Sequence, residues 1–454
     1  MHNLTSLRSL SQALNHGETT AEELIEQALR RAKQSDSIFI AVNEGLTSLA
    51  KSIDAARKRG DTLPPLAGIP ITLKDLFNVR NEVTLAGSVV RKALAKPESE
   101  DAEVIAPLRE AGLLFLGRTN MSEFAFSGMG KNPHYGTPLS IWDRETGRLP
   151  GGSSSGSAVS VAEGIVVATL GSDTAGSCRI PAAFNGIVGV KPSYGRMSLK
   201  GIYPLSPTSD APGPLANDVD SCYLLDLLMC GQLAPKDPLP VLKSRDIKSL
   251  KLVVPQAQVL HDLDTEVQTA FDNSLQALRD SGADITFVEM SSIDDCIDMF
   301  AKRAVVIHEA YHHHREMLEQ HYDQFDPFVG SRLLSGKTIS DQQQLKRYQE
   351  KSRIIELFNQ QFRASGADAI IYPTIACIPP AISETEDLDK ARTVNLRCLR
   401  NTATANYFDG CSISLPCHKA GTAPVGLMVS AMNGDDEDLY AISAAIEQVV
   451  STIR

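Results

Sequence analysis

The chain has 454 residues, of which 43% are hydrophobic and 22% charged, and its formal net charge is −11. This composition is typical of a globular protein with a substantial core. The acidic balance argues against a nucleic-acid or acidic-membrane partner, because both need a basic surface. No run of 18 apolar residues occurs, so no membrane-spanning segment is predicted.

The N-terminus and the cysteines favour a cytoplasmic protein. Residues 1–20 lack the charged and then apolar layout of a secretory signal. The eight cysteines include no CxxC pair and follow no metal-ligand spacing. We therefore expect reduced thiols and a cytoplasmic location.

Helical and strand patterns alternate along the chain, which predicts an α/β protein. Residues 1–62 are expected to form a helical wrap, in which the capping box Thr20–Glu23 opens the first helix. Helices are predicted over 18–34, 45–59, 101–112, 157–164, 218–229, 265–281, 293–365 and 437–451. Strands are predicted over 69–73, 113–116, 165–170, 250–254, 285–288, 369–374, 413–415 and 426–429.

The stretch from Pro150 to Pro192 holds two glycine–serine turns, at 151–155 and 171–177. A helix and a strand between them could bring both turns to one end of a sheet. Glycine lets backbone N–H groups approach a ligand closely, and such groups can stabilise a developing oxyanion. An isolated GGSSSGS is equally typical of a flexible linker. The apolar strand that follows at once makes a linker unfavourable here.

Lys74 closes the buried strand over 69–73. Taken alone, a lysine at the end of a strand is usually a surface group whose stem packs on apolar neighbours. The role of Lys74 therefore depends on which residues surround its amine.

Three segments together resemble the amidase signature family: Gly68–Asp75, Gly151–Ser157 and Gly171–Pro181. The interval of 24 residues between Ser153 and Ser177 is part of the likeness. Further similar segments are Lys191–Pro192, Asp210–Ala216 and Ala405–Pro416, so the resemblance extends from about residue 20 to 450.

The resemblance implies one α/β/α domain over 1–454, with a central mixed, mostly parallel, twisted sheet. The signature core would be 65–225, and 226–454 would complete the sheet and the pocket. It implies a Ser–cis-Ser–Lys triad: Ser177 as nucleophile, Ser153 after a cis peptide bond as bridge, and Lys74 as base. The family members that it resembles need neither cofactor nor metal. The implied oxyanion donors are the N–H groups of Thr174, Ala175, Gly176 and Ser177, and the implied supporting residues are Gly152, Ser154, Asp173 and Arg179.

These roles agree with elementary chemistry. A serine hydroxyl is a poor nucleophile until a neighbour takes its proton. A lysine with its ordinary pKa of about 10 is protonated at neutral pH, so it can act as a base only if desolvation lowers that pKa. The buried strand before Lys74 supplies such a setting. The expected activity is hydrolysis of a small carboxylic amide to an acid and ammonia, by a monomer or a homodimer.

Two positions depart from the common family pattern. Ala175 stands where many members have glycine, but alanine also occurs there in hydrolytic branches. Cys178 stands where Ile, Val or Gly is common, and we expect it to pack as a small hydrophobic residue. The substrate pocket is expected near Met121, Phe126, Ser127, Gly128 and Met129, with parts of 300–335 and 372–380. The identity of the acyl group is not readable from the sequence.

Several other interpretations remain open. Gly152–Gly156 satisfies the GxSxG pattern of a nucleophile elbow with Ser154 as nucleophile, but the preceding residues are polar and His418 is the one isolated histidine downstream. His308 and His312 have helical i, i+4 spacing, which suits zinc, yet a solvated or pocket-lining helix through His314 is the simpler interpretation.

Within the family, two alternatives remain: the glutamine-hydrolysing A subunit of a tRNA-dependent amidotransferase, and a hydrolase of urea derivatives of the allophanate or biuret type. The segments Asn120–Gly130 and Asn401–Asn406 favour a stand-alone amidase. A catalytically inactive binding protein would be expected to lack Lys74 or a serine of the triad, and none is missing.

Overall fold

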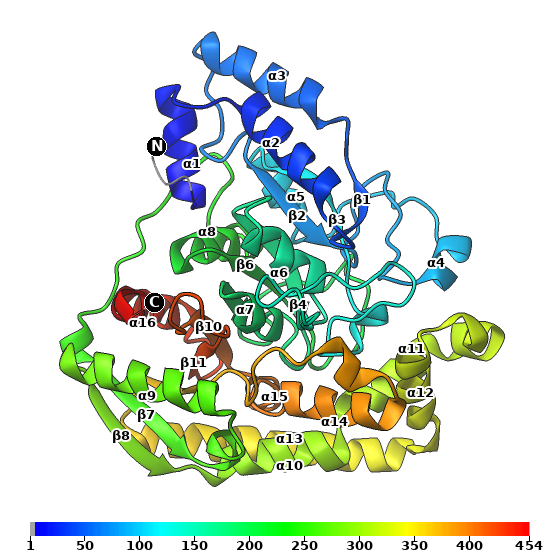
Figure 1. Ribbon diagram of the computed structural model, residues 1–454, viewed down its shortest axis with the longest axis vertical. Coiled ribbons are helices and arrows are strands. Elements are labelled where there is room, and N and C mark those ends of the chain that lie inside the picture. The colour runs from blue at the N-terminus through cyan, green and yellow to red at the C-terminus, as the bar shows by residue number, and fades with distance from the viewer. Residues whose placement is uncertain (1–4, 454) are drawn as a thin grey trace.

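The computed structural model describes residues 5–453, apart from the side chain of Arg303. Within that part of the chain, eleven strands form one sheet in the order β1-β3-β2-β4-β6-β5-β10-β11-β9-β7-β8 (Figure 1). The strands are β1 Phe39–Val42, β2 Pro70–Lys74, β3 Leu114–Thr119, β4 Ala168–Asp173, β5 Val188–Lys191, β6 Ala211–Ala216, β7 Lys251–Gln256, β8 Asp284–Glu289, β9 Ala369–Pro373, β10 Cys411–Pro416 and β11 Gly426–Ala431.

Two groups of helices cover the middle of the sheet. α6 and α7 pack on each other and on β4, β5 and β10, whereas α8 and α16 pack on each other and on β5, β6 and β10. The helices are α1 Leu7–His16, α2 Ala21–Gln34, α3 Leu46–Lys58, α4 Val89–Leu94, α5 Ala106–Glu110, α6 Ser155–Ala162, α7 Arg179–Asn185, α8 Val219–Met229, α9 Thr265–Asp280, α10 Ser291–Arg303, α11 Val305–His321, α12 Pro327–Ser335, α13 Asp341–Ser365, α14 Leu388–Leu399, α15 Ala403–Tyr407 and α16 Asp436–Val450.

The prediction of a mixed α/β architecture is confirmed, but the expectation that parallel pairing dominates is wrong. β2 pairs in parallel with β3 and β4, and β7 pairs in parallel with β8 and β9. The other six pairs are antiparallel, and they include the β10–β11 hairpin and both pairs of β6. The sheet is therefore parallel in two regions, around β2 and around β7, and antiparallel through its middle.

The sequence did not predict the strands β1 and β5, and two further points need correction. β6 was not predicted, because a strand with Pro212 and Pro214 lacks two backbone donors; it pairs with β4 along six residues but with β5 along two. The helix expected over 101–112 is limited to α5 Ala106–Glu110, which begins next to Pro107. Proline is favoured in a first helical turn because its missing N–H has no partner there in any case.

The parallel pairing of β2 with β4 positions the candidate site. Thr72 lies opposite Thr169 and Leu73 opposite Leu170, so Lys74 and the end of β4 lie at the same edge of the sheet. The carboxyl ends of parallel strands are the usual location of ligand sites in α/β proteins.

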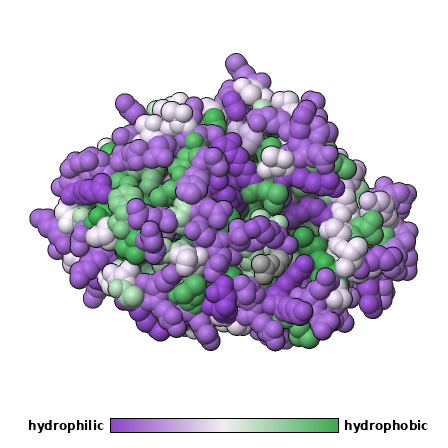
Figure 2. All heavy atoms as spheres, turned by 90° about the horizontal axis from the view of Figure 1, so that it is seen from below, coloured by the Kyte–Doolittle hydropathy of each residue, from purple (hydrophilic) through white to green (hydrophobic). Residues whose placement is uncertain are grey.

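The surface and the helices bear on the expectation that no segment spans a membrane. The face on which α10 and α13 lie is largely hydrophilic, with hydrophobic residues in separate patches (Figure 2). None of the helices in residues 5–453 has the length and apolarity needed to cross a bilayer.

Candidate active site

Lys74 is completely buried, and its amine is directed at serine oxygens. Nζ donates to Oγ of Ser153 at 2.7 Å and to Oγ of Ser172, on β4, at 2.8 Å. Burial lowers the pKa of Lys74 to about 8, although the carboxylates of Asp173 and Asp210 act in the opposite direction. A neutral amine is therefore accessible near neutral pH, which is the property that a lysine base requires.

Ser153 and Ser154 connect this amine to the second serine turn. The peptide bond between Gly152 and Ser153 is cis. The N–H of Ser154 donates to the carbonyl oxygen of Ser177 at 3.2 Å, so the two turns are in direct contact. Ser154 itself precedes α6, is fully buried, and donates its hydroxyl to the carbonyl of Ser172 at 3.4 Å. That side chain is held inside the protein, which disfavours a nucleophile elbow at Ser154.

A buried ion pair holds the turn that carries Ser177. The guanidinium of Arg179 donates to both carboxylate oxygens of Asp173, at 2.8 and 3.0 Å. The same carboxylate accepts the backbone N–H groups of Gly176 at 2.7 Å and Cys178 at 3.1 Å. Burial alone would raise the pKa of Asp173, but Arg179 outweighs it and holds that pKa below its usual value. The loop is thus fixed from inside by one carboxylate, whose charged form Arg179 stabilises.

This geometry narrows the set of candidate oxyanion donors. The N–H of Gly176 is used by Asp173 and is not available to a substrate. The N–H groups of Thr174, Ala175 and Ser177 donate to no acceptor within residues 5–453. Gly176 still needs to be glycine, since its φ is +130° and a Cβ there would lie 2.1 Å from Oγ1 of Thr402.

Several residues that support the turn were not predicted. The hydroxyl of Thr174 donates to Asp210 at 2.6 Å, and burial raises the pKa of Asp210 to about 6. The hydroxyl of Thr402 donates to the carbonyl of Ala175 at 2.8 Å, and the amide of Asn406 donates to Asp173 at 3.1 Å. Asp210 and Asn406 lie in segments that carry the family resemblance, so their place in the sequence was a usable signal.

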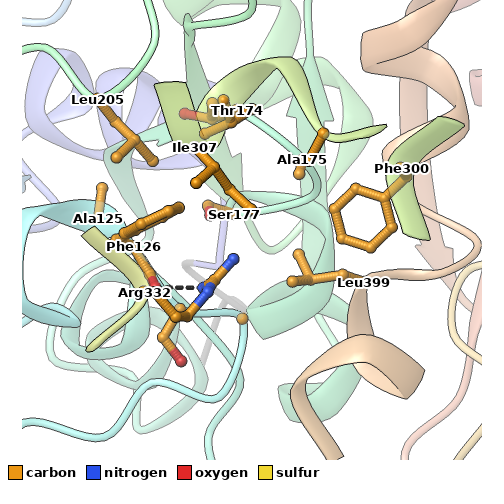
Figure 3. Close-up of a pocket in the computed structure, with 14 residues that line it drawn as sticks. Ala125, Phe126, Thr174, Ala175, Ser177, Leu205, Phe300, Ile307, Arg332 and Leu399 are labelled. Carbon is orange, nitrogen blue, oxygen red and sulfur yellow. Dashed lines mark hydrogen bonds between the residues drawn. The ribbon is translucent and has the colours of Figure 1, made fainter. Parts of the chain in front are cut away.

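Ser177 opens onto a cavity of about 380 Å³ (Figure 3). From the predicted pocket residues, Phe126, Ser127 and Gly128 line it. Its remaining lining residues are Ala125, Thr174, Ala175, Leu205, Phe300, Ala304, Val306, Ile307, Arg332 and Leu399. The walls are therefore mainly apolar, with Arg332 as the one charged side chain among them.

The other predicted pocket residues lie elsewhere. Met121 is buried in the main core, where its carbonyl accepts from the amide of Asn132. Met129 belongs to a small apolar cluster with Leu149 and Phe328. No residue of 372–380 lines the cavity. The predictions for Met121 and Met129 were wrong because their side chains pack in the main core and in the Leu149 cluster and do not reach the cavity.

Cys178 and the histidines at 308, 312 and 314 do not line the cavity next to Ser177. Cys178 is fully buried and burial raises its pKa well above the usual value, so its thiol is not ionised. His314 is a core residue whose ring packs on Phe124 at 4.5 Å. His308 and His312 lie together with Asp341, their ligand atoms all within 4.8 Å of one another, on the outer side of α11. The carboxylate of this group comes from another helix, which the sequence did not indicate.

Comparisons with known proteins identify the family. The model of the Amidase family matches residues 20–440. A 2-amino-5-chloromuconic acid deaminase from Comamonas testosteroni is 30% identical over 89% of this chain and 86% of its own length. The A subunit of a glutamyl-tRNA(Gln) amidotransferase from Natranaerobius thermophilus is 30% identical over 100% of this chain and 97% of its own. A crystal structure of an amidase matches with a TM-score of 0.86 and 32% identity, over 98% of this chain and 99% of that one.

The chain therefore belongs to the amidase signature family. It is a hydrolase that acts on amide C–N bonds.

Proposed function

We propose that the protein hydrolyses a small carboxylic amide to an acid and ammonia through a Ser177–Ser153–Lys74 triad. The observation that carries this proposal is the contact of 2.7 Å between the buried Lys74 amine and the Ser153 hydroxyl, next to the turn that carries Ser177. The N–H of Ser154, in the turn that also carries Ser153, donates to the carbonyl of Ser177. The three side chains of the triad therefore come from segments that contact one another.

In the proposed reaction, Ser177 Oγ attacks the amide carbonyl and gives its proton to Ser153, whose own proton passes to neutral Lys74. The oxyanion that forms accepts from the free N–H groups of the 174–177 turn. The C–N bond then breaks, and the proton returns from Lys74 through Ser153 to the nitrogen, which leaves as ammonia. Water adds to the acyl-enzyme by the same proton route, the acid is released and the Ser177 hydroxyl is restored.

We also infer that residues 1–454 act as one domain, in the cytoplasm, as a monomer or a homodimer. The support for one domain is that a single sheet takes strands from Phe39 to Ala431. The support for a reducing compartment is that no disulfide joins cysteines of the described residues.

A second candidate function is the ammonia-producing A subunit of a tRNA-dependent amidotransferase. It is supported by relatives of that name which align along almost the whole chain. In that case the same triad would act on glutamine, and activity would depend on partner subunits.

The decisive experiment is an ammonia-release assay over a panel of aliphatic, aromatic, amino-acid and urea-derived amides. The wild type is compared with Ser177→Ala and with Ser443→Ala, which removes a buried hydroxyl on α16. We expect at least one amide to be hydrolysed, with the activity lost in Ser177→Ala and kept in Ser443→Ala. Activity that survives Ser177→Ala would contradict the proposed mechanism. Glutamine hydrolysis that appears after addition of amidotransferase partner subunits, and not before, would favour the second candidate.

A further inference from the structure

Arg332 introduces an unpaired cation into the apolar cavity. It lies on α12, and Nη1 donates to the carbonyl of Phe126 at 2.5 Å. Its guanidinium lies over the Phe126 ring, with Cζ 4.0 Å from the centroid. Figure 3 shows the guanidinium directed into the cavity that Ser177 also lines. Within residues 5–453, no carboxylate forms an ion pair with it.

The two buried arginines, Arg118 and Arg179, and the partly buried Arg196 differ in this respect. Arg179 is paired with Asp173, Arg118 with Asp75 and Arg196 with Asp226. A buried charge is normally compensated in this way, because removing it from water without a partner is costly. Burial lowers the pKa of Arg332 to about 10, and no neighbouring charge opposes that effect. The group nevertheless stays cationic at neutral pH.

The free part of the guanidinium is suited to a carboxylate. Arginine presents several N–H donors in a planar fork that matches the two oxygens of a carboxylate, and the Phe126 carbonyl uses one of the nitrogen atoms. The space between the fork and Ser177 is bordered by Phe300, Ile307 and Leu399, which offer apolar contacts and no hydrogen-bonding side chain. A ligand of this cavity would thus be anionic at one end and apolar in its middle.

We propose that the substrate is the monoamide of a short dicarboxylic acid, whose carboxylate binds Arg332 while its amide carbonyl lies at Ser177. This inference rests on the proposed amide hydrolysis and adds the class of acyl group. The space of about 380 Å³ includes the open mouth of the cavity, so the enclosed part next to Ser177 is smaller and suits a short acyl chain. The ligand supplies the counter-ion that no carboxylate of residues 5–453 provides.

The test compares matched amides. Steady-state kcat and KM are measured for succinamate and glutaramate, and for butyramide and valeramide, which have the same carbon chains without the carboxylate. We expect wild-type kcat/KM to be about 100-fold higher for the anionic member of each pair, as for a charge-assisted contact of this type.

Three variants locate the effect. Arg332→Met should remove the preference, mainly by raising KM for the anionic amides, so that kcat/KM falls much further for the anionic member of each pair than for the neutral one. Arg332→Lys should restore part of the preference, because it returns the charge without the fork. Arg91→Met is the matched control: Arg91 also stacks on a ring, that of Tyr203 at 4.3 Å, and donates to a carbonyl, but it does not line the cavity.

Binding of the product type gives a second readout that does not need turnover. Succinate should raise the Tm of the wild type and of Arg91→Met, and should not raise the Tm of Arg332→Met. A wild type that prefers the neutral amides, or an Arg332→Met variant that loses both types of substrate equally, would overturn the inference while leaving amide hydrolysis intact. If the wild type hydrolyses none of the panel amides but succinate still stabilises it through Arg332, the proposed hydrolysis fails and the anion site stands.

Discussion

The two walls of the cavity differ in how they are built. The wall that carries Ser177 consists of the 174–177 turn, and buried polar groups hold it from behind: Asp173 with Arg179, Asp210 with Thr174, and Thr402 with Ala175. The opposite wall comes from Phe300, Ile307 and other residues of helices α10 to α12, where the contacts are apolar except at Arg332.

This difference separates the chemistry from the specificity. In the first wall, a small change in a buried hydrogen bond alters the position of a reacting atom. In the second wall, a change alters how well an acyl group fits. We therefore expect changes in the first wall to lower kcat strongly and changes in the second to act mainly on KM.

The largest effect is expected from removal of the Lys74 amine. Lys74 and Lys191 are both fully buried lysines whose pKa is lowered to about 8 by burial, but Lys191 donates to the carbonyls of Pro192 and Gly410 and not to a serine. Lys74→Met should lower kcat by about 10³-fold, as loss of a general base does. Lys191→Met should instead cost about 1–3 kcal/mol of stability, because two carbonyls lose their donor.

The measurement is kcat from ammonia release, with the free energy of unfolding from urea denaturation for each variant. If kcat falls equally in the two lysine variants, the loss of activity comes from removing a buried lysine and not from removing the contact with Ser153.

The second largest effect is expected from pH. Below a pH of about 8 the Lys74 amine becomes protonated and cannot accept a proton, so kcat/KM should fall about tenfold for each pH unit below that value. At pH 6 it should be about 100-fold below its plateau. The profile is recorded with a neutral amide to avoid ionisation of the substrate. Lys191→Met should show the same fall in kcat/KM below a pH of about 8. If that fall disappears in Lys191→Met, it comes from ionisation of Lys191 and not of Lys74.

A smaller effect on rate is expected from the buried ion pair. Asp173→Asn keeps the shape of the side chain but leaves Arg179 without its counter-ion, which should cost about 3 kcal/mol of stability. The turn should also loosen, and kcat should fall about tenfold, because donors that are no longer fixed stabilise the oxyanion less well. Chemical denaturation and initial rates measure the two effects. An unchanged kcat in a destabilised variant would show that the turn does not depend on Asp173 for its shape.

The smallest effect is expected in the apolar wall. Ile307→Ala removes part of a hydrophobic contact to the acyl group, so KM should rise about tenfold or less with kcat almost unchanged. Ile285→Ala, on β8 and also half-buried, is the matched control and should leave KM unchanged. A large fall in kcat in Ile307→Ala would show that the apolar wall also affects the catalytic step.

Much of the first wall could be predicted from the sequence, because it depends on local features. Glycine–serine turns, an apolar strand before Lys74 and the spacing of Ser153 and Ser177 all lie in short segments. The fold class and eight of the eleven strands followed from the alternation of helical and strand patterns, whereas β1, β5 and β6 were not predicted. The strand Ala211–Ala216 was not predicted because proline disfavours strands. Its pairing with β4 along six residues outweighs this preference.

The second wall could be predicted only in outline. The range 300–335 was expected to border the pocket, and Phe300, Ile307 and Arg332 line the cavity. Nothing in the local sequence indicates which residues of that range, or Leu399 of another helix, meet there. The occupied N–H of Gly176 was equally hidden, because it depends on which oxygen of Asp173 faces the turn. Contacts of this kind are set by tertiary packing and not by sequence spacing.

The most direct test of the account is the labelling of Ser177 by a fluorophosphonate, in which the serine oxygen displaces fluoride from phosphorus and no natural substrate is needed. The labelled residue is identified by peptide mass spectrometry, and the labelling rate is measured from pH 6 to 10 in the wild type, Lys74→Met and Lys191→Met. The account predicts one label, on Ser177, at a rate that rises through a pH of about 8 and that is lost in Lys74→Met alone. A label on another residue, or an unchanged rate in Lys74→Met, would contradict it.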